Sequence, residues 1–109
     1  MQIVIRGTHV VEMTKLWKRG ELYQVSIIRP EMVEMLRPYD NREVTVIVAG
    51  VPFKARLKYE TPKRGNPYIR IFLPKKLNVI WSRLHEMAGQ VKVEIIIENE
   101  GTAGGEYDG

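Results

Sequence analysis

Positively charged and aromatic side chains alternate along two neighbouring segments of the chain, residues 53–60 and 68–73. They stand at every second position: Lys54, Arg56 and Lys58 in the first segment, and Tyr68, Arg70 and Phe72 in the second. Side chains two residues apart in a strand point to the same face, so a hairpin over 53–73 would place all six on its outer face. Cations on such a face can neutralise phosphates while nucleic-acid bases stack on the rings.

Two turns add further cations to this predicted surface. Lys63-Arg64-Gly65 lies between the two segments, and Lys18-Arg19-Gly20 is an earlier copy of the same tripeptide. A different interpretation of the pattern stays open, in which a helix covers the rings and the alternating cations are those of any solvated strand face. The predicted nucleic-acid-binding residues are Lys18, Arg19, Lys54, Arg56, Lys58, Lys63, Arg64, Tyr68, Arg70 and Phe72.

The sequence contains no recognisable arrangement of catalytic or metal-binding residues. There is no Cys, and the two histidines, His9 and His85, are far apart and lie in no Cys/His/Asp cluster. Ser26 and Ser82 lack the context of a nucleophile elbow, and the chain has single turn glycines where a phosphate loop needs several. We therefore predict a protein that is not an enzyme and that binds no metal or cofactor.

Two similar halves, about residues 9–48 and 53–97, must position the predicted surface. In each half the Lys-Arg-Gly turn precedes an alternating apolar strand, a proline, a short helical pattern and a final strand. The corresponding segments are strands 23–28 and 68–73, Pro30 and Pro74, helices 31–36 and 75–88, and strands 44–48 and 91–97. Such repetition predicts an internal duplication of a strand-strand-helix-strand unit.

The prolines and the apolar spacing of the second helix predict the local structure around them. Proline has no N–H and a nearly helical φ, so it suits the first helical turn while the residue before it stays extended. In the second helix, Leu77, Ile80, Trp81, Leu84 and Met87 recur at spacings of three and four. These residues form one helical face, and we expect Trp81 to be a core residue.

The second half resembles the AbrB/SpoVT family of swapped-hairpin DNA-binding proteins. The resemblance rests on Arg70-Ile71-Phe72-Leu73-Pro74-Lys75-Lys76-Leu77, followed by a helix, Gly89 and the strand Val91-Lys92-Val93-Glu94-Ile95. The first half has Arg29-Pro30-Glu31 in the corresponding place and lacks the glycine. With the related double-psi and cradle-loop barrels, the resemblance implies a pseudo-twofold closed barrel and a DNA-binding, transcriptional-regulator role. The family's DNA-binding hairpins do not align here, so none of their residues is transferred.

The length of the chain and the distribution of its charges both favour a single basic domain. The chain has 109 residues, and all 17 Lys and Arg but only nine of the 13 Asp and Glu lie in residues 1–97, a net charge of +8. Residues 98–109 hold the other four acidic residues, a net charge of −4, and are rich in glycine, so we expect a disordered tail. The excess of cations favours an anionic partner, although abundant Lys, Glu and Arg without Cys are also typical of a thermophilic protein.

The sequence therefore predicts a mostly β protein, a β-barrel with two short helices in a single domain over 1–97. Its predicted partner is nucleic acid, with DNA favoured over RNA, and its predicted state is a monomer or homodimer. The start has no leader pattern and no apolar run approaches the ~20 residues that cross a bilayer, so a cytoplasmic protein without membrane contact is expected. The alternatives are a protein-interaction or scaffold barrel and a small nucleotide-binding enzyme.

Overall fold

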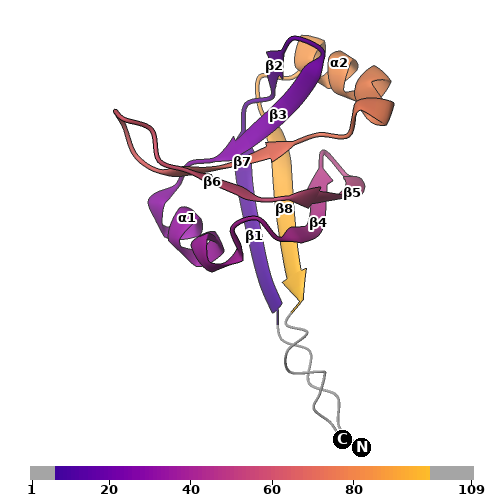
Figure 1. Cartoon of the computed structure of the whole chain (residues 1–109). Coiled ribbons are helices and arrows are strands. Elements are labelled where there is room, and N and C mark those ends of the chain that lie inside the picture. The colour runs from indigo at the N-terminus through magenta and orange to yellow at the C-terminus, as the bar shows by residue number, and fades with distance from the viewer. Residues whose placement is uncertain (1–6, 99–109) are drawn as a thin grey trace, which may run out of the picture.

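The computed structural model describes residues 7–98, which fold into two four-stranded antiparallel sheets and two short helices (Figure 1). In spatial order the first sheet contains β1 (Gly7–Thr14), β8 (Val91–Glu98), β4 (Glu43–Val48) and β5 (Val51–Arg56). The second sheet contains β2 (Trp17–Arg19), β3 (Leu22–Ile27), β7 (Tyr68–Phe72) and β6 (Lys58–Glu60). The helical segments are α1 (Pro30–Leu36), η1 (Arg37–Tyr39), η2 (Lys75–Leu77) and α2 (Asn78–Met87).

The order of the strands is unchanged when the two halves of the chain are exchanged. Replacing β1 to β4 by β5 to β8, and the reverse, turns β1-β8-β4-β5 into β5-β4-β8-β1, the same sheet counted from its other edge. The second sheet behaves in the same way, because β3 and β7 pair at its centre and β2 and β6 are its edges. Both halves thus contribute equivalent strands at equivalent places.

The strands do not close into the expected barrel. Within residues 7–98 the pairings join them into two separate sheets, and no pairing connects one sheet to the other. The strand expected over 53–60 is divided at Leu57, because β5 pairs with β4 in the first sheet while β6 pairs with β7 in the second. Leu57 is buried at this crossing, where its N–H donates to the Arg42 carbonyl and its carbonyl accepts from Asn41. Leu16 is buried at the corresponding crossing from β1 to β2.

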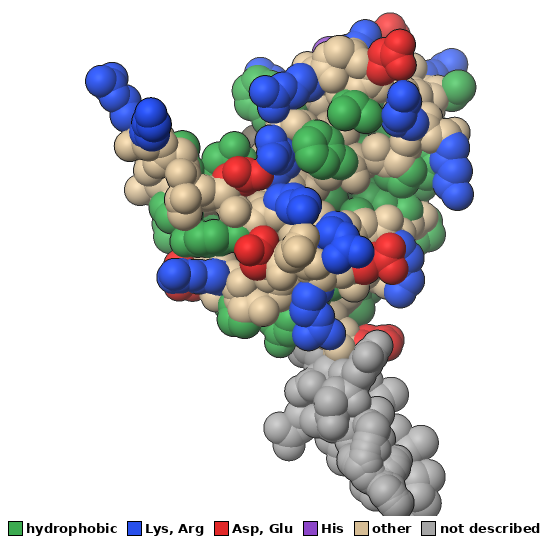
Figure 2. All heavy atoms as spheres, in the orientation of Figure 1, with side chains coloured by type: hydrophobic (Ala, Val, Ile, Leu, Met, Phe, Trp, Pro, Cys, Tyr) green, Lys and Arg blue, Asp and Glu red, His purple; other side chains and the backbone are tan. Residues whose placement is uncertain are grey.

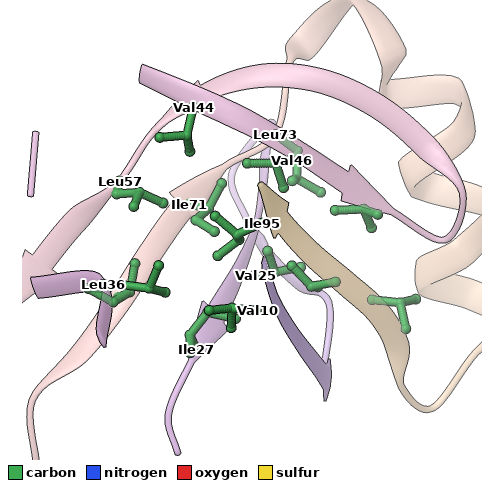
Figure 3. Close-up of a cluster of buried hydrophobic side chains, with 14 of the residues drawn as sticks. Val10, Val25, Ile27, Leu36, Val44, Val46, Leu57, Ile71, Leu73 and Ile95 are labelled. Carbon is green, nitrogen blue, oxygen red and sulfur yellow. The ribbon is translucent and has the colours of Figure 1, made fainter. Parts of the chain in front are cut away.

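The hydrophobic core lies between the sheets, and the burial alternates along the longer strands β1, β4 and β8. In β8, for example, Val91, Val93, Ile95 and Ile97 are buried while the residues between them are exposed or partly exposed. Figure 3 shows side chains from both sheets and from α1 pointing toward one another, including Val10, Val25, Ile71 and Ile95. The alternation that predicted these strands therefore reflects a buried face on each.

The two prolines precede helical segments, as expected, but not in the same way. Pro30 is the first residue of α1, and Arg29 before it is extended. Pro74 is itself extended and is followed by the 3₁₀ turn η2, so α2 begins only at Asn78. The helix ends at Met87, and Ala88 is extended. The glycines of both Lys-Arg-Gly tripeptides have positive φ, +64° at Gly20 and +95° at Gly65, which is the conformation that glycine adopts most readily in tight turns.

The apolar face predicted for the second helix is buried only in part. Trp81 has no exposed surface, which confirms it as a core residue, and its Nε1–H donates to the Pro74 carbonyl at 2.9 Å. Met87 is 77% exposed and Ile80 is also exposed, contrary to the prediction. The reason is that α2 lies at one end of the sheets, so that only part of its circumference reaches the core (Figure 1). No helix within residues 7–98 is long and apolar enough to span a bilayer.

Glu12 is a carboxylate on the inner side of β1, with only 5% of its surface exposed. One of its oxygens accepts a hydrogen bond from the backbone N–H of Ile28 at 3.0 Å, which ties β1 to the end of β3. We predict that Glu12→Ala lowers the free energy of unfolding by about 1–3 kcal/mol, because the partly buried Ile28 N–H would lose its acceptor. Glu12→Gln keeps an acceptor at this position and should cost less. Urea titration of both variants measures the difference, and equal losses would contradict the role of the bond.

Candidate nucleic-acid interface

The outer face of the second sheet gathers aromatic, polar and cationic side chains from all four of its strands. Its orientation follows from the alternation, because Val25, Ile27, Ile69 and Ile71 on β3 and β7 are buried toward the core. Cross-strand pairing aligns Trp17 with Gln24 and Phe72, Ser26 with Arg70 and Lys58, and Tyr68 with Glu60. We call this surface the β3–β7 face; it consists of Trp17, Gln24, Ser26, Lys58, Glu60, Tyr68, Arg70 and Phe72.

Arg70 at the centre of the β3–β7 face is already engaged by its neighbours. Its guanidinium forms a partly buried ion pair with Glu60 and lies 4.9 Å from the centre of the Phe72 ring. Its Nε is buried and has no hydrogen-bond partner. The predicted phosphate contact at Arg70 therefore has to compete with Glu60, and Arg70 also acts as a positioning group for Phe72.

The cations of the segment 53–60 are divided between the two sheets. Lys58 belongs to the β3–β7 face, whereas Lys54 and Arg56 lie on β5 at the edge of the first sheet. The prediction that one hairpin over 53–73 places all six residues on one face is wrong for these two. Arg56 and Lys58 nevertheless stay close, since both donate to Asn41, to its carbonyl and its side-chain oxygen respectively.

The two Lys-Arg-Gly tripeptides place their cations at opposite edges of the second sheet. Lys63 and Arg64 are exposed on the segment between β6 and β7, which projects from the body in Figures 1 and 2. Lys18 and Arg19 are exposed on the edge strand β2. Figure 2 shows the resulting distribution, with Lys and Arg side chains spread among apolar ones and fewer Asp and Glu.

Trp17 was not predicted as a site residue, yet it is the most prominent ring of this face. It is 49% exposed, and the Lys15 ammonium lies 4.9 Å from its ring centre. The segment 9–17 has an irregular apolar pattern because the chain crosses from β1 to β2 at the buried Leu16. The signal that could have pointed to Trp17 is its position directly before Lys18-Arg19.

A hollow of about 380 Å³ opens beside β2 on this surface. Trp17, Ile28 and Tyr68 supply its apolar walls, and Gln24 and Ser26 supply polar groups. Lys18 and Arg19 complete the lining. The hollow thus combines two aromatic rings, hydrogen-bonding groups and two positive charges within one concave surface.

Most of the predicted phosphate-binding cations have no carboxylate partner. Within residues 7–98, the ion pairs of Lys and Arg involve Arg29, Arg37, Arg70, Lys75 and Lys92. Arg70 is the sole member of the predicted set among them. The others, which are Lys18, Arg19, Lys54, Arg56, Lys58, Lys63 and Arg64, form no ion pair there, although Arg56 and Lys58 donate to Asn41 and the Lys18 ammonium lies over the Tyr23 ring.

Both histidines contact neighbouring side chains. His9 contacts Glu94 at 3.1 Å on the first sheet, and the His85 ring packs edge-on against Tyr23 at 5.8 Å. In the described part of the chain, no three His, Cys, Asp or Glu side chains come together in a way that could hold a metal ion. Comparisons with protein-family models, with curated proteins and with solved structures found no match to this chain.

Proposed function

We propose that the protein binds nucleic acid through the β3–β7 face and the cations around it, with DNA favoured and a regulator-like role in transcription. One observation carries the proposal: three aromatic side chains that are not fully buried, Trp17, Tyr68 and Phe72, share a sheet surface with Lys58 and lie beside Lys18 and Arg19, and within residues 7–98 these three cations form no ion pair. Unpaired cations attract phosphates, and accessible rings stack on bases.

The preference for DNA rests on the resemblance to the AbrB/SpoVT family. The strand order that survives exchange of the two halves supports the proposal that both descend from one duplicated strand-strand-helix-strand unit. In such a molecule, one chain carries both units that AbrB-type proteins bring together from two subunits. We propose this relationship for the arrangement of the halves, without a closed barrel.

A salt titration tests the proposed function. Binding of labelled duplex and single-stranded DNA and RNA, followed by fluorescence anisotropy from low to moderate salt, is expected to weaken steeply. If four to seven of the unpaired cations contact phosphates, the slope of log affinity against log salt should be about −3 to −6. Affinity that is absent at low salt, or that hardly responds to salt, would contradict the proposal.

The second candidate function is a protein-docking domain. It is favoured by the outward side of α2, where Val79 and Met87 are each 77% exposed. A docking surface of this kind depends on apolar contacts, and its affinity should scarcely change with salt. The same titration therefore separates the two functions.

A further inference from the structure

We infer that the bound strand is single-stranded and that the hollow beside β2 holds one of its nucleotides. The base would lie against Trp17 and a phosphate beside Arg19. This inference rests on the proposed function and deepens it, since it names the class of nucleic acid and the position of one nucleotide.

The exposed ring of Trp17 is the first argument. Trp17 stands on an edge strand, paired with Gln24 of β3, and Lys15 lies near its ring. Half of its surface is open to solvent, and it forms a wall of the hollow. Bases in a duplex are already stacked on one another, so a ring of this kind gains a stacking partner only from an unpaired base.

The polar lining of the hollow is the second argument. Gln24 and Ser26 lie between Trp17 and Tyr68 in this surface, and the Gln24 side-chain oxygen is buried without a hydrogen-bond partner. A buried acceptor left unpaired costs free energy, which a ligand with a suitably placed N–H recovers when the Gln24 amide turns its oxygen toward the hollow. The edges of nucleobases carry such donors beside acceptors, which the amide N–H of Gln24 and the Ser26 hydroxyl can match.

The charge at the rim is the third argument. Lys18 and Arg19 both line the hollow, and neither forms an ion pair within residues 7–98. Arg19 is two residues from Trp17 on β2 and shares its face, so a base on the indole brings its own backbone phosphate near Arg19, whereas the Lys18 ammonium lies 5.9 Å from the centre of the Tyr23 ring. An uncharged aromatic ligand would leave Arg19 without a partner, whereas a nucleotide provides a base for the ring and a phosphate for the cation.

The residue of the second half that corresponds to Trp17 is not aromatic. In the first half Trp17 on β2 pairs with Gln24 on β3. At the corresponding place in the second half, Glu60 on β6 pairs with Tyr68 on β7. Glu60 is acidic and is held by Arg70, so it offers neither a ring nor a positive charge. The two halves are thus equivalent in strand order but not in this site, and we expect one nucleotide in this position per chain.

The test uses the full chain with fluorescently labelled single-stranded oligonucleotides of DNA and RNA and the matching duplexes. Single strands are expected to bind more tightly than duplexes. Trp17→Ala should weaken their binding about 10-fold, the effect of losing one stacked base, and Trp17→Phe should keep most of the affinity. Met13→Ala, an exposed apolar change on β1 of the other sheet, is the matched control and should have no effect.

Intrinsic fluorescence adds a direct readout. The molecule has two tryptophans, and Trp81 is buried and hydrogen-bonded to Pro74. Addition of unlabelled single strand should quench the emission of exposed Trp17, and the quenching should disappear in Trp17→Phe.

The outcomes distinguish this inference from the function on which it rests. Equal or tighter binding of duplexes, with unchanged affinity in Trp17→Ala and no quenching, overturns the nucleotide position even if binding still weakens with salt. That result leaves the proposed function standing. Absence of binding to every nucleic acid at low salt overturns both.

Discussion

Replacing Arg19 and Lys58 together by glutamate is expected to weaken nucleic-acid binding about 100-fold. Within residues 7–98 neither side chain forms an ion pair; Arg19 lies on the edge strand β2, and Lys58 lies on β6 within the β3–β7 face. Two lost charge-assisted contacts at about 1.5 kcal/mol each amount to about 3 kcal/mol, a factor of 100 or slightly more. The slope of log affinity against log salt should also become shallower by about 2.

The matched control is Lys76→Glu/Arg83→Glu. It changes the net charge by the same amount at two exposed cations of η2 and α2 that also form no ion pair. Because these cations lie outside the predicted set, the control should lose much less affinity than Arg19→Glu/Lys58→Glu. Equal losses in both variants would show that net charge alone attracts the nucleic acid, and the β3–β7 face would not be the site. Thermal unfolding of both variants checks that neither loses the fold.

Arg70 is a poor choice for the same experiment, although the sequence pattern ranks it with the others. Its guanidinium pairs with Glu60 and packs on Phe72. Glutamate at position 70 would bring two carboxylates together in a partly buried place, so a loss of binding would not be separable from a loss of stability. Arg19 is exposed on β2 and is free of this complication, whereas Lys58 gives up its hydrogen bond to the Asn41 side chain, so the thermal-unfolding check matters most for Lys58.

Trp81→Ala is expected to lower the free energy of unfolding by about 3–5 kcal/mol. The indole is completely buried, packs edge-on against Phe53 at 5.6 Å and donates its N–H to the Pro74 carbonyl. Through these two contacts, Trp81 connects α2 with β5 and with the segment that follows β7. The free energy of unfolding of a small domain is about 5–15 kcal/mol, so the variant should unfold at a much lower urea concentration.

Two further variants isolate the cause. Trp81→Phe retains much of the packing but loses the hydrogen bond, and should cost less than Trp81→Ala. Trp17→Ala removes a tryptophan that is half exposed and should change stability little, although it changes binding. Similar losses in Trp81→Ala and Trp17→Ala would contradict the assignment of Trp81 to the core.

Local patterns in the sequence account for much of the fold. Three of these patterns depend only on residues that are close together in the sequence. They are the alternation in 91–97, the spacing around Trp81 and the change from strand to helix near Pro30 and Pro74. These features reappear as β8, the buried Trp81 and the helical segments that follow the prolines. The repeated order of strands and helices is likewise visible in the sequence, and the two sheets preserve it. The predicted tail over 98–109 and the predicted start of the chain lie, apart from Glu98, outside the described residues.

The arrangement of the candidate site depended on contacts between segments that are distant in the chain. Alternation continues unbroken through Leu57, so the sequence contains no sign that Arg56 and Lys58 belong to different sheets. The pairing of Arg70 with Glu60, and the exposure of Trp17 beside Gln24, likewise arise only when strands are set side by side. The two-residue alternation of a strand determines which of its side chains share a face. Which strands lie beside it depends on the packing of the whole core. For this reason the sequence predicts which residue types a basic, aromatic surface contains. The tertiary structure alone decides which of these residues lie next to one another.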